Sequence, residues 1–123
     1  MRALVGLGFV LAGVIGSGCG SGGSDVELVR GVTVDVDARD NTFDPEATEV
    51  AAGTDVRFTN VGRNEHNVIP VSDDQTELLV ETDALGPGDE AVVRLTEPGT
   101  YRYYCSIHGT ARAGMIGTIE VTG

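Results

Sequence analysis

Near its C-terminus, the chain carries three kinds of metal-binding side chain within eleven positions: a thiol at Cys105, an imidazole at His108 and a thioether at Met115. A second imidazole lies upstream at His66. Structural zinc usually has closed tetrahedral ligation dominated by Cys and His, which one thiol, two imidazoles and a thioether fit poorly. Two imidazoles and one thiolate in a plane, with a weak axial Met, suit copper as both Cu(I) and Cu(II). We therefore predict one copper ion bound by these four residues.

A census of ligand types supports this prediction. The sequence has two His, two Cys and two Met. Apart from Met1 and Cys19, which fall in the N-terminal segments described below, each of them belongs to the predicted site. Taken singly, a Cys is usually a small buried hydrophobe, and a Met usually fills gaps in a core. The joint spacing Cys-x2-His-x6-Met, with a His upstream, favours a shared metal site.

The element that positions the thiol is predicted to be a strand. The segment from Tyr101 to Cys105 is rich in aromatic residues and follows a Pro-Gly break. Tyr101, Tyr103 and Cys105 alternate, so they should share one face, and two aromatic rings make that face the buried one. His108 is then expected on a short loop, and Met115 at the start of the next strand.

The stretch from Tyr101 to Met115 resembles the copper-binding loop of the cupredoxins, the family of plastocyanin- and azurin-like blue copper proteins. Further similar segments lie upstream in the same order, at residues 42–45, 50–60 and 66–68. The resemblance covers about Gly31 to Gly123. It implies an all-β fold, a two-sheet Greek-key sandwich.

The loops around the ligands differ from the plastocyanin pattern in two respects and match it in one. Six residues separate His108 from Met115, where plastocyanin has four, and Ile107 stands where plastocyanin has a proline. The longer loop leaves the axial geometry and the reduction potential open. In plastocyanin-like proteins the residue after the first His ligand ties the two ligand loops together, and Asn67 with Ser106 match those positions.

The resemblance implies a type 1 copper protein that shuttles single electrons between redox proteins such as a cytochrome, an oxidase or a reductase. The alternative is a copper-binding protein for storage, delivery or resistance, in which redox change is incidental. Enzymatic activity is not expected, because both His would be metal ligands and none would remain as a general base. Tyr104 and Ser106 flank Cys105, which also excludes the His-Cys-His arrangement of multicopper oxidases.

The rest of the chain is predicted to form short strands separated by turns. Alternation of apolar and polar residues predicts further strands at 32–36, 56–60 and 116–121. Shorter strands are expected at 48–51 and 91–95, with a bend at Phe43–Pro45. The acidic segment 73–83 fits either a short helix or an irregular crossing. About seven to eight strands indicate one sandwich domain over residues 31–123.

The N-terminal 30 residues are predicted to serve export rather than folding. Residues 1–18 hold one Arg and an apolar run too short to span a membrane, which is typical of a signal peptide. Cys19 follows small residues, as at a bacterial lipoprotein cleavage site, and Gly20–Ser24 is a flexible tether within segment 19–30. We expect a protein of the periplasm or cell surface, attached to the membrane only through a lipid on Cys19. Simple secretion is the alternative.

The charge of the chain limits its partners. The formal net charge is −11, with 19 Asp and Glu against eight basic residues, all of them Arg. Nucleic-acid binding is excluded, because it depends on basic contacts to phosphates. The acidic surface fits a basic protein partner, or simply solvation of a monomer in a salty or crowded exterior.

Overall fold

The computed structural model describes residues 32–123. The predicted signal segment 1–18 and the tether 19–30, including Cys19, lie outside the described residues. The described strands are β1 (Thr33–Arg39), β2 (Thr42–Asp44), β3 (Ala47–Ala51), β4 (Asp55–Asn60), β5 (Ile69–Pro70), β6 (Glu90–Arg94), β7 (Gly99–Gly109) and β8 (Gly114–Thr122). Two 3₁₀ turns, η2 (Thr76–Leu78) and η3 (Thr82–Ala84), lie between β5 and β6.

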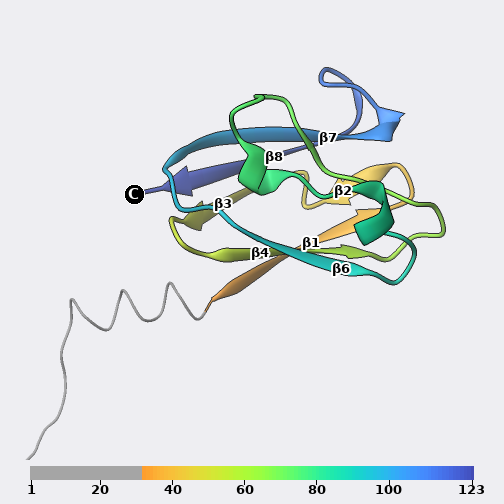
Figure 1. Ribbon diagram of the computed structural model, residues 1–123, viewed down its shortest axis with the longest axis horizontal. Helices are drawn as coiled ribbons and strands as arrows, with labels where there is room; N and C mark the ends of the chain where they lie inside the picture. Colours follow the sequence, from red (N-terminus) through yellow and green to blue (C-terminus); the bar gives the residue numbers. More distant parts are fainter. Residues whose placement is uncertain (1–31) are drawn as a thin grey trace, which may run out of the picture.

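The strands form two four-stranded mixed sheets, which confirms the predicted all-β sandwich. One sheet has the order β2-β1-β4-β6 and the other has the order β3-β8-β7-β5. β1 pairs with β4 in parallel, and β3 pairs with β8 in parallel, while the other neighbours are antiparallel. Figure 1 shows β7 and β8 in one layer, and β1, β4 and β6 in the other.

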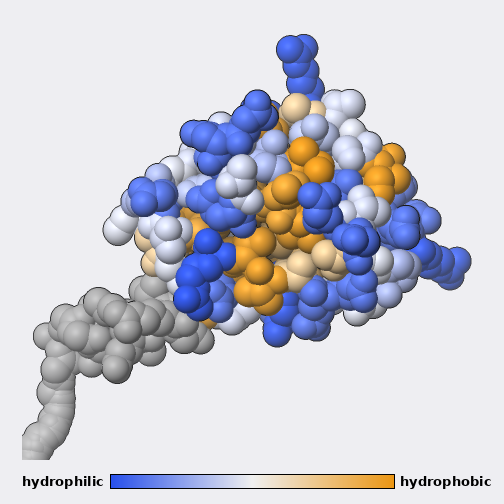
Figure 2. Space-filling view, in the orientation of Figure 1, coloured by the Kyte–Doolittle hydropathy of each residue, from blue (hydrophilic) through white to orange (hydrophobic). Residues whose placement is uncertain are grey.

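The core lies between the two sheets, because alternate residues of each strand point inward. In β4 the burial alternates along the whole strand, with Val56, Phe58 and Asn60 inside. In β7 the inward residues include Tyr101, Tyr103 and Cys105, as predicted, each no more than 2% exposed. Figure 2 shows apolar side chains gathered between the layers and bordered by hydrophilic side chains.

Three aromatic rings pack edge to face in the centre of this core. Tyr103 lies 4.9 Å from Phe43 and 5.5 Å from Phe58 between ring centroids. Directly across the ladder, Tyr103 pairs with Gly117 of β8. A Cβ on Gly117 would overlap the Tyr103 ring, so the ring occupies the space that any other residue at this position would need. The phenol oxygen of Tyr103 is buried and has no hydrogen-bond partner.

The structure differs from the sequence-based expectation at Phe43 and at His108, which lies within β7 and not on a loop, and it decides between the two alternatives left open for segment 73–83. The predicted bend at Phe43 is a short strand, β2, which pairs with β1 across a turn where Asn41 has a φ of 75°. The acidic segment 73–83 is an irregular crossing that contains η2 and the start of η3. Leu78 and Val80 bury the apolar side of this crossing. Within residues 32–123, no helix is long and apolar enough to cross a membrane.

Candidate metal centre

His66 lies on the loop that follows β4, and a buried Asn fixes that loop. The side-chain amide of Asn60 donates to the carbonyl oxygens of Asn64 at 2.8 Å and of Leu85 at 2.9 Å. Its amide oxygen accepts from the backbone N–H of Gly62 at 2.9 Å. The backbone N–H of His66 also donates to Leu85, at 3.2 Å. The side chain of His66 is fully buried in this position.

Cys105 and His108 lie in an irregular part of β7 near its end. They are three residues apart, so in a regular strand they would point to opposite faces. The regular pairing with β8 stops at Tyr104–Ile116 and resumes at Gly109–Gly114. Between these pairs β7 carries residues 105–108, whereas β8 carries Met115 alone. This bulge lets both side chains turn to one side, in line with the way bulges re-aim side chains near functional sites.

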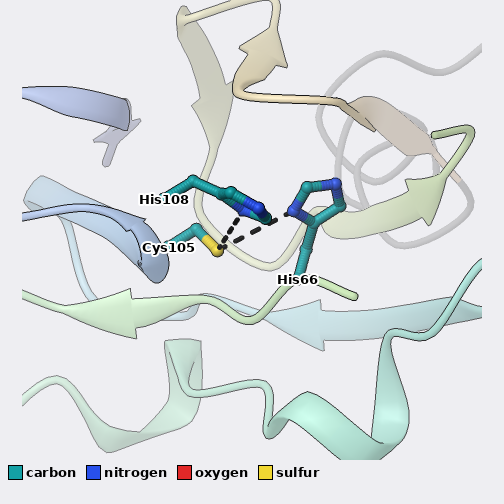
Figure 3. A group of neighbouring side chains, drawn as sticks. All are labelled: His66, Cys105 and His108. Carbon is teal, nitrogen blue, oxygen red and sulfur yellow. Dashed lines mark hydrogen bonds between the residues drawn. The ribbon is translucent and has the colours of Figure 1, made fainter. Parts of the chain in front are cut away.

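The structure brings His66, Cys105 and His108 into one cluster (Figure 3). The sulfur of Cys105 lies 3.8 Å from Nδ1 of His66 and 3.7 Å from Nδ1 of His108. The two imidazole rings are 5.0 Å apart between centroids and inclined at 60°. Each ring therefore presents the same nitrogen, Nδ1, toward the thiol.

These separations match a shared metal better than they match direct hydrogen bonds. A first-row ion bonds to imidazole nitrogen at about 2.0 Å and to thiolate at about 2.3 Å. In a trigonal plane such bonds place nitrogen and sulfur about 3.7 Å apart. The observed 3.7 and 3.8 Å agree with that figure. The donor set of one thiolate and two imidazoles then favours copper over the oxygen-preferring cations.

The comparisons with known proteins agree with this geometry. Residues 30–122 match the model of a family described as copper binding proteins, plastocyanin/azurin family. The chain belongs to this family of cupredoxins.

Two curated plastocyanins illustrate the similarity. The chain is 39% identical over 87 residues to the chloroplastic plastocyanin of Silene latifolia subsp. alba. The matched region covers 64% of this chain and 52% of that protein. It is 36% identical over 86 residues to the plastocyanin of Daucus carota, covering 65% of this chain and 87% of that protein. The chain therefore spans about half the length of the Silene protein and most of the Daucus protein.

Solved structures show the same fold. A Cu-containing nitrite reductase from Thermus scotoductus SA-01 is similar with a TM-score of 0.63 and 30% identity, over 75% of this chain and 23% of that chain. A variant of amicyanin in its reduced state is similar with a TM-score of 0.62 and 25% identity, over 79% and 88% of the two chains.

The long loop of this cupredoxin closes as a tight hairpin. Gly109 pairs with Gly114, and the N–H of Thr110 donates to the carbonyl of Ala113 at 2.8 Å. Gly114 has a φ of 90°, and a Cβ on either Gly would collide with backbone of the other arm. Both positions therefore require Gly. The extra residues stay within the hairpin, and Met115 lies fully buried at the start of β8.

The two loops that carry the ligands of this cupredoxin are joined by a pair of hydrogen bonds. The side-chain amide of Asn67 donates to Oγ of Ser106 at 2.9 Å, and its oxygen accepts from the backbone N–H of Ser106 at 2.9 Å. The same amide also donates to Oγ1 of Thr82 in η3 at 3.0 Å. These bonds hold the chain beside His66 against the chain beside Cys105, and so limit the relative movement of the ligands.

The electrostatic environment favours a neutral His66. Burial, followed by the nearby His108, lowers the pKa of His66, while Asp40 acts in the opposite direction. Only a neutral imidazole can bind a metal, so the lowered pKa keeps Nδ1 available near neutral pH. The other ring nitrogen, Nε2, is buried without a hydrogen-bond partner, and Asp40 Oδ1 is 3.7 Å away.

The sequence did not indicate Asp40, Asn60 or Thr82 as parts of this centre. Asp40-Asn41 carries an ordinary turn signal, and Asn60 was expected only as the end of a strand. No spacing in the sequence relates Asp40 or Thr82 to the ligand loops, since Asp40 meets the His66 loop through the pairing of β1 with β4, and Thr82 meets Asn67 through the crossing between β5 and β6.

Proposed function

We propose that this cupredoxin is a type 1 copper electron carrier that moves single electrons between redox proteins outside the cytoplasm. The observation that supports this most is the triangle of Cys105, His66 and His108, whose donor atoms have the spacing of a trigonal metal site. When bound, copper supplies a one-electron couple between Cu(I) and Cu(II).

The residues of the site have distinct proposed roles. Nδ1 of His66 and Nδ1 of His108 are the nitrogen ligands, and the sulfur of Cys105 is the thiolate. Met115, which is fully buried at the start of β8, would supply the weak fourth ligand. The buried position of three of these side chains and the Asn67–Ser106 hydrogen bonds keep the ligands fixed, so little rearrangement is needed when the charge of the site changes.

Two observations favour a carrier over an enzyme. The nitrite reductase matches this chain over only 23% of its own length, so the similarity concerns one part of that protein. The sequence has no third His that could bind a further copper or act as a base. We therefore propose that the protein is not itself a reductase.

Spectroscopy of the copper-loaded protein tests the proposal. A tuned electron carrier should show an intense visible thiolate-to-copper band that disappears on reduction and returns on oxidation. A pale, weakly held Cu(II) would contradict the proposal and would favour storage, delivery or resistance. The measurement is a visible absorption titration with ascorbate and ferricyanide.

We propose that electrons enter and leave through the side of His108. His108 is only half-buried, whereas His66 and Cys105 are fully buried, so the path from the protein surface to the metal is shortest there. Ile107 beside it is 48% exposed, and Ala113 in the adjoining hairpin is exposed, which leaves a small apolar surface for close approach.

The alternative route through Tyr104 has less support. Tyr104 lies on the other face of β7 from Cys105 and is half-buried. The acidic residues Asp74 and Glu77, which could attract a basic partner, contribute to raising the pKa of Tyr101, after the larger effect of burial. Their charges therefore act near the start of β7, whereas the metal site lies near its other end.

Ala113→Glu should slow electron self-exchange between two copies of the protein by at least about tenfold, because two like charges would meet at the His108 surface. The visible spectrum should change little. NMR line broadening in mixtures of Cu(I) and Cu(II) protein measures the rate. Asp74→Asn is the control, and should change mainly the salt dependence. An unchanged rate in Ala113→Glu, together with a strong decrease in Tyr104→Leu, would rule out the His108 route.

We also propose that Cys19 anchors the protein to the membrane through a lipid. The support lies in the sequence, where an apolar segment and small residues precede Cys19 and a Gly/Ser tether follows it. A tether of this composition would let the copper domain reach partners near the membrane surface.

Cys19→Ser should move the protein from the membrane fraction to the soluble fraction or leave its N-terminal segment uncleaved. Fractionation of cells that express the full chain, followed by mass spectrometry of the N-terminal peptide, measures both outcomes. Wild-type protein found entirely in the soluble fraction, with a first residue other than Cys19, would refute the anchor and support simple secretion.

A further inference from the structure

One carboxylate outside the ligand set is held close to the metal centre. Asp40 occupies the turn between β1 and β2, in the sheet from which the loop of His66 emerges. Its Oδ1 accepts hydrogen bonds from the backbone N–H of Arg63 at 2.9 Å and of Asn64 at 3.1 Å. A Cβ on Gly62 would overlap the same oxygen, so the loop fits tightly against this carboxylate. Asp40 thus links the β1–β2 turn to the His66 loop.

The same oxygen faces the far side of the His66 ring. Nε2 of His66 is buried, has no hydrogen-bond partner and lies 3.7 Å from Oδ1 of Asp40. This distance is too long for a direct hydrogen bond, yet short enough for attraction between an N–H on the buried Nε2 and the carboxylate of Asp40, whose side chain is 36% exposed. Because Nδ1 faces Cys105, Nε2 is the nitrogen that must carry the hydrogen when a metal is bound.

We propose that Asp40 is a positioning residue that fixes His66 in the tautomer with hydrogen on Nε2 and stabilises Cu(II) relative to Cu(I). The proposal rests on the electron-carrier function proposed above. Carboxylates that face the outer nitrogen of a metal-bound His orient the ring and increase its basicity as a ligand. Cu(II) carries one more positive charge than Cu(I), so a fixed negative charge on this side favours the oxidised form.

Asp40→Asn is the most direct test, because it removes the charge while keeping an oxygen to accept from the N–H groups of Arg63 and Asn64. Asp44→Asn is the matched control. Asp44 lies on the same hairpin and its carboxylate pairs with Arg39 at 3.2 Å. Each variant removes one negative charge, so the effect of net charge cancels in the comparison. Asp40→Ser provides a second uncharged variant if Asp40→Asn does not fold.

The first measurement is the tautomer of His66 by ¹⁵N NMR of the metal-free protein. The wild type and Asp44→Asn should show the Nε2–H form, whereas Asp40→Asn should show a mixture of both tautomers. The second is the reduction potential of the copper-loaded protein. Asp40→Asn should shift the Cu(II)/Cu(I) equilibrium about tenfold toward Cu(I) relative to Asp44→Asn, which is about 59 mV for one electron.

The outcomes separate this inference from the proposed function. Identical tautomers and potentials in Asp40→Asn and Asp44→Asn would overturn the role of Asp40, even if the wild type is intensely coloured. If the wild type binds copper without the thiolate band, the electron-carrier function fails. The tautomer of the metal-free protein would then still decide whether Asp40 positions His66.

Discussion

Cys105→Ala is expected to abolish the intense visible absorption of the copper-loaded protein. The band requires a thiolate bound to copper, and Cys105 is the one Cys in the described part of the chain. The two imidazoles of His66 and His108 alone should hold Cu(II) more weakly, with the pale colour of a nitrogen- and oxygen-ligated ion. Absorption spectra recorded during copper titration of wild type and variant measure both the band and the affinity.

Met115→Leu is the control for this result. It removes a buried sulfur while preserving most of the volume in the core, so the fold should be retained. The thiolate band should persist, and the reduction potential should rise because an axial donor is lost. An intense band in Cys105→Ala would show that the site has been assigned to the wrong residues.

Gly117→Ala is expected to destabilise the domain by about 3 kcal/mol, the upper part of the range for overpacked cores. The added Cβ would overlap the ring of Tyr103, which packs edge to face against Phe43 and Phe58. Urea unfolding of the metal-free protein measures the change in the free energy of unfolding. Gly86→Ala, where the added Cβ meets only the exposed carboxylate of Asp89, should cost less than about 1 kcal/mol.

A double mutant locates the cause of this loss. Tyr103→Leu removes the ring atoms that the new Cβ would meet, at the cost of packing against the two Phe rings. In that background Gly117→Ala should be much less damaging than in the wild type, which a double-mutant cycle measures as a coupling energy. Equal losses in both backgrounds would place the strain elsewhere in the β7–β8 ladder.

The sequence predicted the parts of the fold that depend on local periodicity. The alternation of Tyr101, Tyr103 and Cys105 placed them correctly on the buried face, because side chains in a strand alternate whatever the rest of the chain does. The short strand β2 was missed, because three residues are too few for alternation and its pairing with β1 depends on the turn at Asn41. The crossing at 73–83 is fixed by the burial of Leu78 and Val80 against the core, which no local pattern reveals.

In the metal centre, too, the sequence predicted what depends on residue type and missed what depends on tertiary structure. Residue type alone indicated the four candidate ligands, since His, Cys and Met are scarce in this chain. The bulge that turns Cys105 and His108 to one side could not be predicted, because it appears only as a shift in pairing with β8. The contacts of Asp40 and Asn60 with the His66 loop likewise depend on tertiary structure, and neither residue has a chemically distinctive type or spacing.

The Gly109–Gly114 pair has a consequence for how such loops can change in length. In an antiparallel hairpin, one added residue on each arm creates one further pair and leaves every residue before it on the same face. The loop between His108 and Met115 is two residues longer than in the plastocyanin pattern, which corresponds to one residue on each arm and therefore to one further pair. Lengthening in steps of two therefore preserves the inward direction of Met115, whereas a single insertion within the paired arm would turn it toward solvent. A hairpin of this kind can therefore accept loops that differ in length by an even number of residues without a change in the direction of the Met115 side chain.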